Sequence, residues 1–198
     1  LVSHQAGRAS VLARLEAVGI HTAPDDARVA SLVQEVKERE LRGYTYDGAE
    51  ASFELLARRR LHDLPDWYGV ESFRVLNEHR GDTMLAEATV KLRVAGQLVM
   101  AVAEGDGPVN ALDAALRRAL EPAYPALADL TLADYKVRIL DSSAGTAAAV
   151  RVLIESVDGH GARWTTVGAS TDVIDASYQA MADALGFHLL RAGVMPLA

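Results

Sequence analysis

Two short segments of the sequence carry residue types suited to holding a small anionic ligand. The first, residues 104–110, contains Gly105, Gly107 and Pro108. Glycine lets backbone approach a ligand closely, and proline suits the first position of a helix because the helix needs no N–H there. Free N–H groups at a helix start can hold a carboxylate. The segment therefore predicts a helix start that could bind one.

The second segment, residues 168–175, has a similar design. Asp172 is a natural helix cap, and Asp175 follows three residues later. Taken alone, each segment can equally be a well-formed helix start with no ligand, because glycine and proline mark loops in most proteins. Their matching places in a duplicated unit favour a ligand site, since two helix N-termini facing one seam would form an anion site.

The duplication covers most of the chain. Residues 73–77 recur as residues 137–141, sixty-four positions later, and from Val102 and Val167 onward the offset is sixty-five. A repeat with one residue added in a turn is typical of two copies of one supersecondary unit. The two repeats are assigned to residues 70–130 and 131–198.

Each copy predicts three strands followed by a helix. In residues 86–94 the apolar side chains take every second place, which is typical of a strand with one packed and one wet face. Residues 95–97 form a hairpin turn into residues 98–102. From Val109 to Leu120 the apolar residues recur at helical spacing. We therefore predict an α+β fold for residues 67–198, with an antiparallel sheet system and helices on one face.

Residues 1–66 predict a helical linker subdomain. Apolar residues recur at helical spacing in three segments, 11–18, 29–41 and 53–61. The apolar stripes are modest, the outer faces are charged, and no core of their own is evident. We expect these helices to connect or dock other parts of the protein.

Composition narrows the functional classes. The net charge of −7 argues against a nucleic-acid or anionic-membrane partner, which requires clustered Lys and Arg. The absence of cysteine excludes disulfides and thiolate chemistry. No run of about twenty apolar residues and no signal-peptide layout occur, so we expect a cytoplasmic protein without a membrane partner.

Residues suited to catalysis are not grouped in the sequence. The six histidines are scattered without the short spacing of a metal site, and we expect each on the surface or in a loop. Ser142 and Ser143 lack the glycine-flanked elbow of a serine hydrolase, and no pair of carboxylates stands out. We therefore predict no catalytic, metal-binding or cofactor-binding residue in this chain.

The amino-acid sequences of several segments resemble the C-terminal part of a known enzyme family. Residues 43–56 read GYTYDGAEASFELL, residues 105–112 read GDGPVNAL, and residues 170–177 read STDVIDAS. With the duplicated unit, they resemble the citramalate, 2-isopropylmalate and homocitrate synthase family over the whole chain. The GAEASFELL stretch points to the citramalate branch. The opening SHQAGRAS, residues 3–10, is similar to the Ser-x-x-Ser-Gly-Arg segment that follows the family's catalytic barrel, with Ala6 replacing the second serine.

The resemblance implies the linker and regulatory region of a larger enzyme. Family members condense acetyl-CoA with a 2-oxo acid in a metal-dependent TIM barrel. A helical linker then leads to a regulatory domain of two βββα units, which binds the end-product amino acid and dimerises. The barrel and its metal-binding His-x-His are absent here. We therefore expect an inactive fragment, with the divalent metal and acetyl-CoA belonging to the parent and no cofactor in this chain.

Three interpretations remain open. The first is the regulatory region of a citramalate synthase, which joins acetyl-CoA to pyruvate in isoleucine biosynthesis and is inhibited by isoleucine. The second is the regulatory region of a leucine-sensing 2-isopropylmalate synthase. The third is a standalone module for amino-acid binding or dimerisation. In the first two, the partners are the branched-chain effector, a second copy and the catalytic barrel.

A branched-chain amino acid needs a carboxylate site, an ammonium acceptor and an apolar cavity, because burying its charges without partners costs several kcal/mol. Backbone N–H groups of residues 105–110 could take the carboxylate. Asp141, Asp172 or Asp175 could accept the ammonium, and Asn77, the counterpart of Asp141 in the first repeat, is a weaker candidate. The predicted ligand-binding residues are Gly105, Asp106, Gly107, Pro108, Val109, Asn110, Leu112, Leu140, Asp141, Asp172, Ile174, Asp175 and Ala176.

Overall fold

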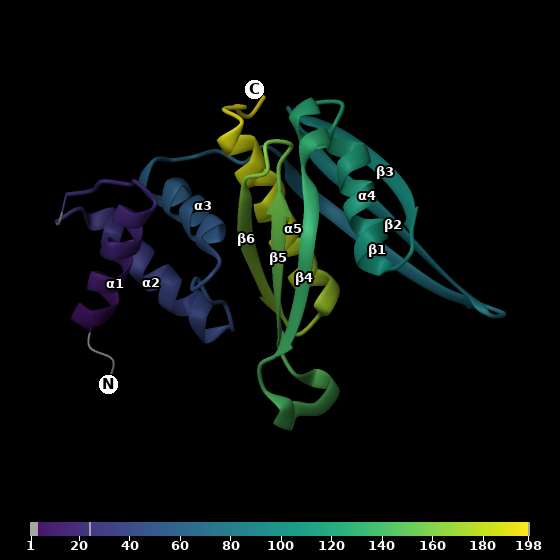
Figure 1. Cartoon of the computed structure of the whole chain (residues 1–198), viewed down its shortest axis with the longest axis horizontal. Helices are drawn as coiled ribbons and strands as arrows, with labels where there is room; N and C mark the ends of the chain where they lie inside the picture. The colour runs from purple at the N-terminus through teal and green to yellow at the C-terminus, as the bar shows by residue number, and fades with distance from the viewer. Residues whose placement is uncertain (1–3, 24, 198) are drawn as a thin grey trace.

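The computed structural model describes residues 4–23 and 25–197 (Figure 1). Ser3, the first residue of the SHQAGRAS segment (residues 3–10), lies outside the described residues. The elements in chain order are α1 (His4–Ala17), α2 (Ala27–Leu41), α3 (Glu50–Leu61), β1 (Gly69–Arg80), β2 (Thr83–Val94), β3 (Gln97–Gly105), α4 (Pro108–Leu120), the 3₁₀ helix η1 (Pro125–Asp129), β4 (Thr131–Ile139), the 3₁₀ helix η2 (Ser142–Ala147), β5 (Val150–Val157), β6 (Arg163–Ser170) and α5 (Val173–Arg191). Within the described residues, no helix is both long enough and apolar enough to cross a membrane.

The three N-terminal helices lie where the sequence predicts them, but they do have a core of their own. The expectation that they lack one was wrong because each narrow stripe was judged alone, whereas the three stripes meet in space. The buried apolar residues of this core are Val11, Leu15, Ile20, Val29, Leu32, Val33, Val36, Tyr46, Ala49, Phe53, Leu56, Ala57 and Leu61. Val167 of β6 belongs to the same cluster, so the linker is packed onto the rest of the chain.

The predicted order of three strands and a helix is confirmed in both repeats. Strands β1, β2 and β3 form one antiparallel sheet (sheet A), and β4, β5 and β6 form a second (sheet B). Helix α4 packs on sheet A, and α5 packs on sheet B. One core cluster joins both sheets and both helices, so each sheet has one face covered from inside the molecule.

The two helices lie between the two sheets. The ring of Phe73 on β1 lies 5.0 Å from the ring of Tyr178 on α5, so α5 also contacts sheet A. A small cavity lined by Arg117 of α4, Ile154 of β5 and Met181 of α5 places α4 against sheet B. Figure 1 shows that α4 and α5 run in the same direction, toward the end where the C-terminus lies. Their N-termini are therefore at the same end of the molecule.

The strand register changes the alignment of the two repeats in their first strands, β1 and β4. Phe73 pairs with Val90, and Tyr135 takes the equivalent place on β4. The offset here is therefore sixty-two rather than sixty-four. Matching bulges support this alignment, because Glu71 and Ala133 are the extra residues at the same place in the two strands.

The corrected register changes one pair of counterparts. Asn77 pairs with Ala86, and Ile139 pairs with Val150, so Asn77 corresponds to Ile139 and not to Asp141. A shift of two residues leaves every side chain on the same face of its sheet. Alternation of apolar residues therefore could not reveal the error.

One histidine departs from the expected surface position. His188 is 6 % exposed and lies within α5. Its Nε2 lies 2.7 Å from the carbonyl oxygen of Ala126, and its ring stacks on Trp164. The helical spacing of α5 places this residue on the buried side, which the scatter of histidines along the sequence does not indicate.

Candidate functional site

The structure brings the predicted ligand-binding residues to one end of the molecule, where α4 and α5 begin and β4 ends (Figure 1). Their exposure differs. Those exposed are Asp106, Asn110, Asp141 and Asp172; those half-buried are Gly105, Gly107, Pro108, Val109, Leu140, Ile174 and Asp175; those buried are Leu112 and Ala176. Leu112 and Ala176 are fully enclosed in the core of the chain and support the site from beneath.

The start of α4 is a tightly folded loop without a side-chain cap. Pro108 begins the helix, and the N-cap residue, Gly107, has no side chain that could bond to the first turn. The backbone N–H of Asp106 donates to Oδ1 of Asn110 at 3.1 Å. A Cβ added at Gly105 would lie 2.4 Å from the backbone nitrogen of Ala111, so this close approach requires glycine. The uncapped first turn suits a carboxylate ligand.

The start of α5 differs from that of α4 because it carries its own carboxylate. Asp172 Oδ1 accepts hydrogen bonds from the backbone N–H groups of Ile174 and Asp175, at 2.7 and 3.2 Å. This side chain occupies the place that an anionic ligand would take. The two helix starts are therefore not equivalent, and α4 is the one suited to an anion.

Leu140, predicted to line the ligand cavity, packs against the linker. A Cβ added at Gly43, in the loop between α2 and α3, would lie 2.1 Å from Cδ1 of Leu140. Gly43 has a φ of +106°, a conformation that favours glycine. Arg151 of β5 holds the same loop by donating from Nε to the carbonyl oxygen of Gly43 at 2.5 Å.

A second contact between the site and this loop passes through Gln179 on α5. Gln179 Nε2 donates to Asp175 Oδ2 at 2.8 Å. Gln179 Oε1 accepts from the backbone N–H of Ala169 at 3.2 Å and from the hydroxyl of Tyr44. Burial raises the pKa of the Tyr44 hydroxyl, so it remains a proton donor at neutral pH.

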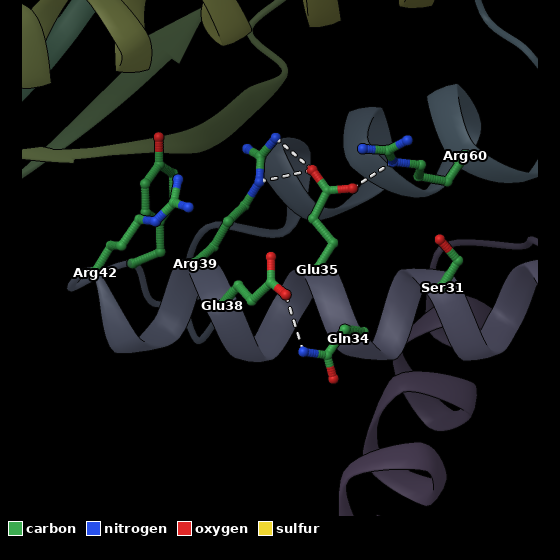
Figure 2. Close-up of a pocket in the computed structure, with 8 residues that line it drawn as sticks. Ser31, Gln34, Glu35, Glu38, Arg39, Arg42 and Arg60 are labelled. Atoms are coloured by element: carbon green, nitrogen blue, oxygen red, sulfur yellow. Dashed lines mark hydrogen bonds and ion pairs between the residues drawn. The ribbon is translucent and has the colours of Figure 1, made fainter.

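Tyr44 also borders a polar cleft of about 500 Å³ on the linker. Figure 2 shows Glu35 between Arg39 and Arg60, with both guanidinium groups directed at its carboxylate. Burial opposes the charge on Glu35, but Arg60 and Arg39 outweigh it and hold the pKa of that carboxyl below its ordinary value. The guanidinium of Arg39 lies 5.6 Å from the centre of the Tyr44 ring, over its face.

The contacts of Gly43, Tyr44 and Gln179 could not be predicted from the sequence. Gly43 and Tyr44 belong to the stretch that carries the family resemblance, but the resemblance assigned them no contact. Gln179 lies 135 residues from Tyr44, and no local pattern joins them. Across the part of the chain that the structure describes, no three acidic or histidine side chains are grouped so that they could hold a metal ion.

Comparison with protein families gives a match over most of the chain. The model described as the LeuA allosteric (dimerisation) domain matches residues 47–189. The match includes α3 as well as both βββα units.

Comparison with characterised proteins gives relatives that align over nearly the whole chain. The (R)-citramalate synthase of Streptomyces coelicolor is 52% identical over 99% of this chain and 37% of its own length. That of Geobacter sulfurreducens is 47% identical over 97% of this chain and 37% of its own length. The 2-isopropylmalate synthase of Aquifex aeolicus is 30% identical over 96% of this chain and 34% of its own length. The chain thus spans little more than a third of the relatives it matches.

Proposed function

Because this chain belongs to the LeuA allosteric (dimerisation) domain family, we propose that it is the regulatory region of a citramalate synthase. The parent enzyme joins acetyl-CoA to pyruvate in isoleucine biosynthesis, and this region binds the end product for feedback inhibition. The catalytic barrel, with its divalent metal and acetyl-CoA site, belongs to the part of the parent outside this chain. The observation that carries the proposal is the identity of 52% to a citramalate synthase over nearly the full chain.

The proposed effector site lies where α4 and α5 begin. The uncapped first turn of α4 takes the carboxylate of the amino acid. Asp175 is the ammonium acceptor best supported, since Asp172 already bonds to two backbone N–H groups of α5. Val109 and Ile174, both half-buried at the two helix starts, supply apolar contacts for a branched side chain.

We propose that a second copy of the chain binds the outer face of sheet A. The register places five exposed apolar side chains on that face, opposite the face covered by α4: Leu76, Leu85, Leu98, Met100 and Val102. The family's description as a dimerisation domain supports a homodimer. Exposed apolar patches of this kind mark interaction surfaces in soluble proteins.

Calorimetric titration of the purified chain with isoleucine, leucine and valine tests the effector. Saturable isoleucine binding, with leucine at least about tenfold weaker, is the expected result, a difference of about 1.4 kcal/mol. The reverse preference would support the second candidate, a leucine-sensing 2-isopropylmalate synthase, which the Aquifex aeolicus relative favours at 30% identity. Binding of none of the three would contradict the effector proposal.

A further inference from the structure

We propose that the loop at Gly43 and Tyr44 transmits occupancy of the site at the start of α5 to the linker, with Gln179 as the positioning residue. The inference rests on the proposed function for its biological meaning. Its structural content is a chain of contacts that begins at Asp175 and ends on α3. The contacts from Asp175 to the loop can be tested without a ligand.

The loop is the place where the linker meets the site end of the two-repeat domain. Leu140, directly after β4, packs against Gly43 so closely that a Cβ there would clash at 2.1 Å. Arg151 donates to the carbonyl oxygens of Gly43 and Tyr44, at 2.5 and 3.4 Å. Gln179 accepts the Tyr44 hydroxyl. Leu140 after β4, Arg151 of β5 and Gln179 of α5 thus hold two loop residues in one position.

Neighbours on both sides fix the orientation of the Gln179 amide. The backbone N–H of Ala169 can only donate, so it requires the amide oxygen Oε1 on its side. Oδ2 of the Asp175 carboxylate accepts the hydrogen bond, so it requires the donor Nε2 on the other side. In this orientation Oε1 also faces Tyr44, whose hydroxyl donates to it.

A ligand in the site can therefore affect the loop by engaging one hydrogen-bond acceptor, the carboxylate of Asp175. The carboxylate of Asp175 bonds to Gln179, and Gln179 bonds to Tyr44, so the hydrogen-bonded route from Asp175 to Tyr44 passes through Gln179. A ligand ammonium bound to that carboxylate competes with Gln179 Nε2. The amide then keeps Ala169 but loses the second of the two neighbours that fix its orientation, so the acceptor of the Tyr44 hydroxyl is held less firmly.

The effect continues from Tyr44 into the linker. The ring of Tyr44 lies beneath the guanidinium of Arg39 on α2. Arg39 bonds to Glu35, which also pairs with Arg60 on α3 (Figure 2). Movement of Tyr44 would thus alter its contact with Arg39, which belongs to the ion-pair network that joins α2 to α3. A ligand shifts such an arrangement only by its difference in affinity for the two positions.

Amide hydrogen exchange on the ligand-free chain tests the contact chain directly. The backbone N–H groups of Gly43 and Tyr44 are bonded to the carbonyl oxygens of Glu40 and Arg39, each at 3.0 Å, so their exchange reports the loop. We expect exchange about threefold faster or more in both Gln179→Ala and Asp175→Ala. Residues 177–181 should keep their wild-type exchange, which controls for fraying of α5.

Asp82→Ala, which removes an exposed carboxylate from the turn between β1 and β2, is the matched control and should leave the loop unchanged. Faster exchange in Gln179→Ala with wild-type exchange in Asp175→Ala would overturn the proposal, because the site would then have no access to the loop. Unchanged exchange in both variants would overturn it as well.

The ligand-dependent step is tested in the full-length parent with Tyr44→Phe. Isoleucine should bind this variant within about twofold of wild type but inhibit about tenfold less effectively. Equal inhibition of variant and wild type, with isoleucine bound to both, would contradict transmission through Tyr44. Failure of isoleucine to bind the wild-type chain would contradict the proposed function. The hydrogen-exchange results would still decide whether Asp175 affects the loop.

Discussion

The backbone N–H of Val167 on β6 donates a hydrogen bond to Oγ of Ser52 on α3, with an N to O distance of 3.0 Å. Strand β6 is an edge of sheet B, and an unpaired edge exposes backbone groups that must find partners. The Ser52 hydroxyl in turn bonds to the half-buried carboxyl of Asp183 on α5. Ser52 of the linker thus accepts a hydrogen bond from the edge strand β6 and also contacts α5.

Replacing Ser52 with Ala should lower the free energy of unfolding by about 1–3 kcal/mol, because the buried N–H of Val167 loses its acceptor. Urea denaturation measures the loss. Ser31→Ala, at an exposed position on α2, is the control and should change stability by less than about 0.5 kcal/mol. An equal effect of the two substitutions would show that the Ser52 bond does not hold the edge.

Gly168 allows α5 to lie directly on β6. A Cβ at this position would lie 2.0 Å from the carbonyl oxygen of Ala176, a backbone atom that cannot rotate away. Gly168→Ala should therefore destabilise the chain by about 3 kcal/mol or more. Gly159→Ala offers a matched comparison, since its nearest neighbour would be 3.6 Å away and its stability should stay near wild type. Thermal unfolding of both variants decides the point.

The exposed apolar side chains on the outer face of sheet A lead to a prediction about the homodimer. Val102 is 39 % exposed, whereas its counterpart Val167 is fully buried beneath the linker. If a second copy covers this face, Met100→Glu should weaken the dimer at least about tenfold in sedimentation equilibrium by placing a charge in an apolar contact. Lys91→Glu, on the same face but already polar, should have a smaller effect. A Met100→Glu dimer as tight as wild type would move the interface elsewhere.

The half-buried carboxyl of Asp183 should make the free energy of unfolding depend on pH. Burial raises its pKa above the ordinary 3.8, although Arg59 opposes the shift. The folded state therefore holds this proton more tightly than the unfolded chain, and stability declines as pH rises from about 3.8 through the raised pKa. Asp183→Asn should remove that decline, so urea unfolding should show the variant gaining on wild type across this range. A constant difference at every pH would refute the assignment.

The order of elements could be predicted from the sequence because it depends on local periodicity. The alternation in β2 and the helical spacing in α4 each lie within about a dozen residues, and glycines at Gly19 and Gly43 mark the helix ends. The duplication then predicted the second unit from the first. The positions of the two helix starts at one end followed from this repeat.

Features that depend on three-dimensional contact could not be predicted in the same way. The register of β4 was misjudged by two residues because an even shift preserves the alternating faces. The core shared by α1, α2 and α3 was missed because each apolar stripe was considered separately. The bond between Tyr44 and Gln179 spans 135 residues and leaves no trace in local pattern.

The most direct test of the account is an NMR titration of the isotopically labelled chain with isoleucine. The amides of residues 105–107, 109–111 and 172–176 should show the largest shift changes, saturating at the calorimetric affinity, with smaller changes at Gly43 and Tyr44. Changes confined to another region, such as the cleft at Arg39 and Arg60, would contradict the proposed site. The absence of any saturable change would contradict effector binding by this chain.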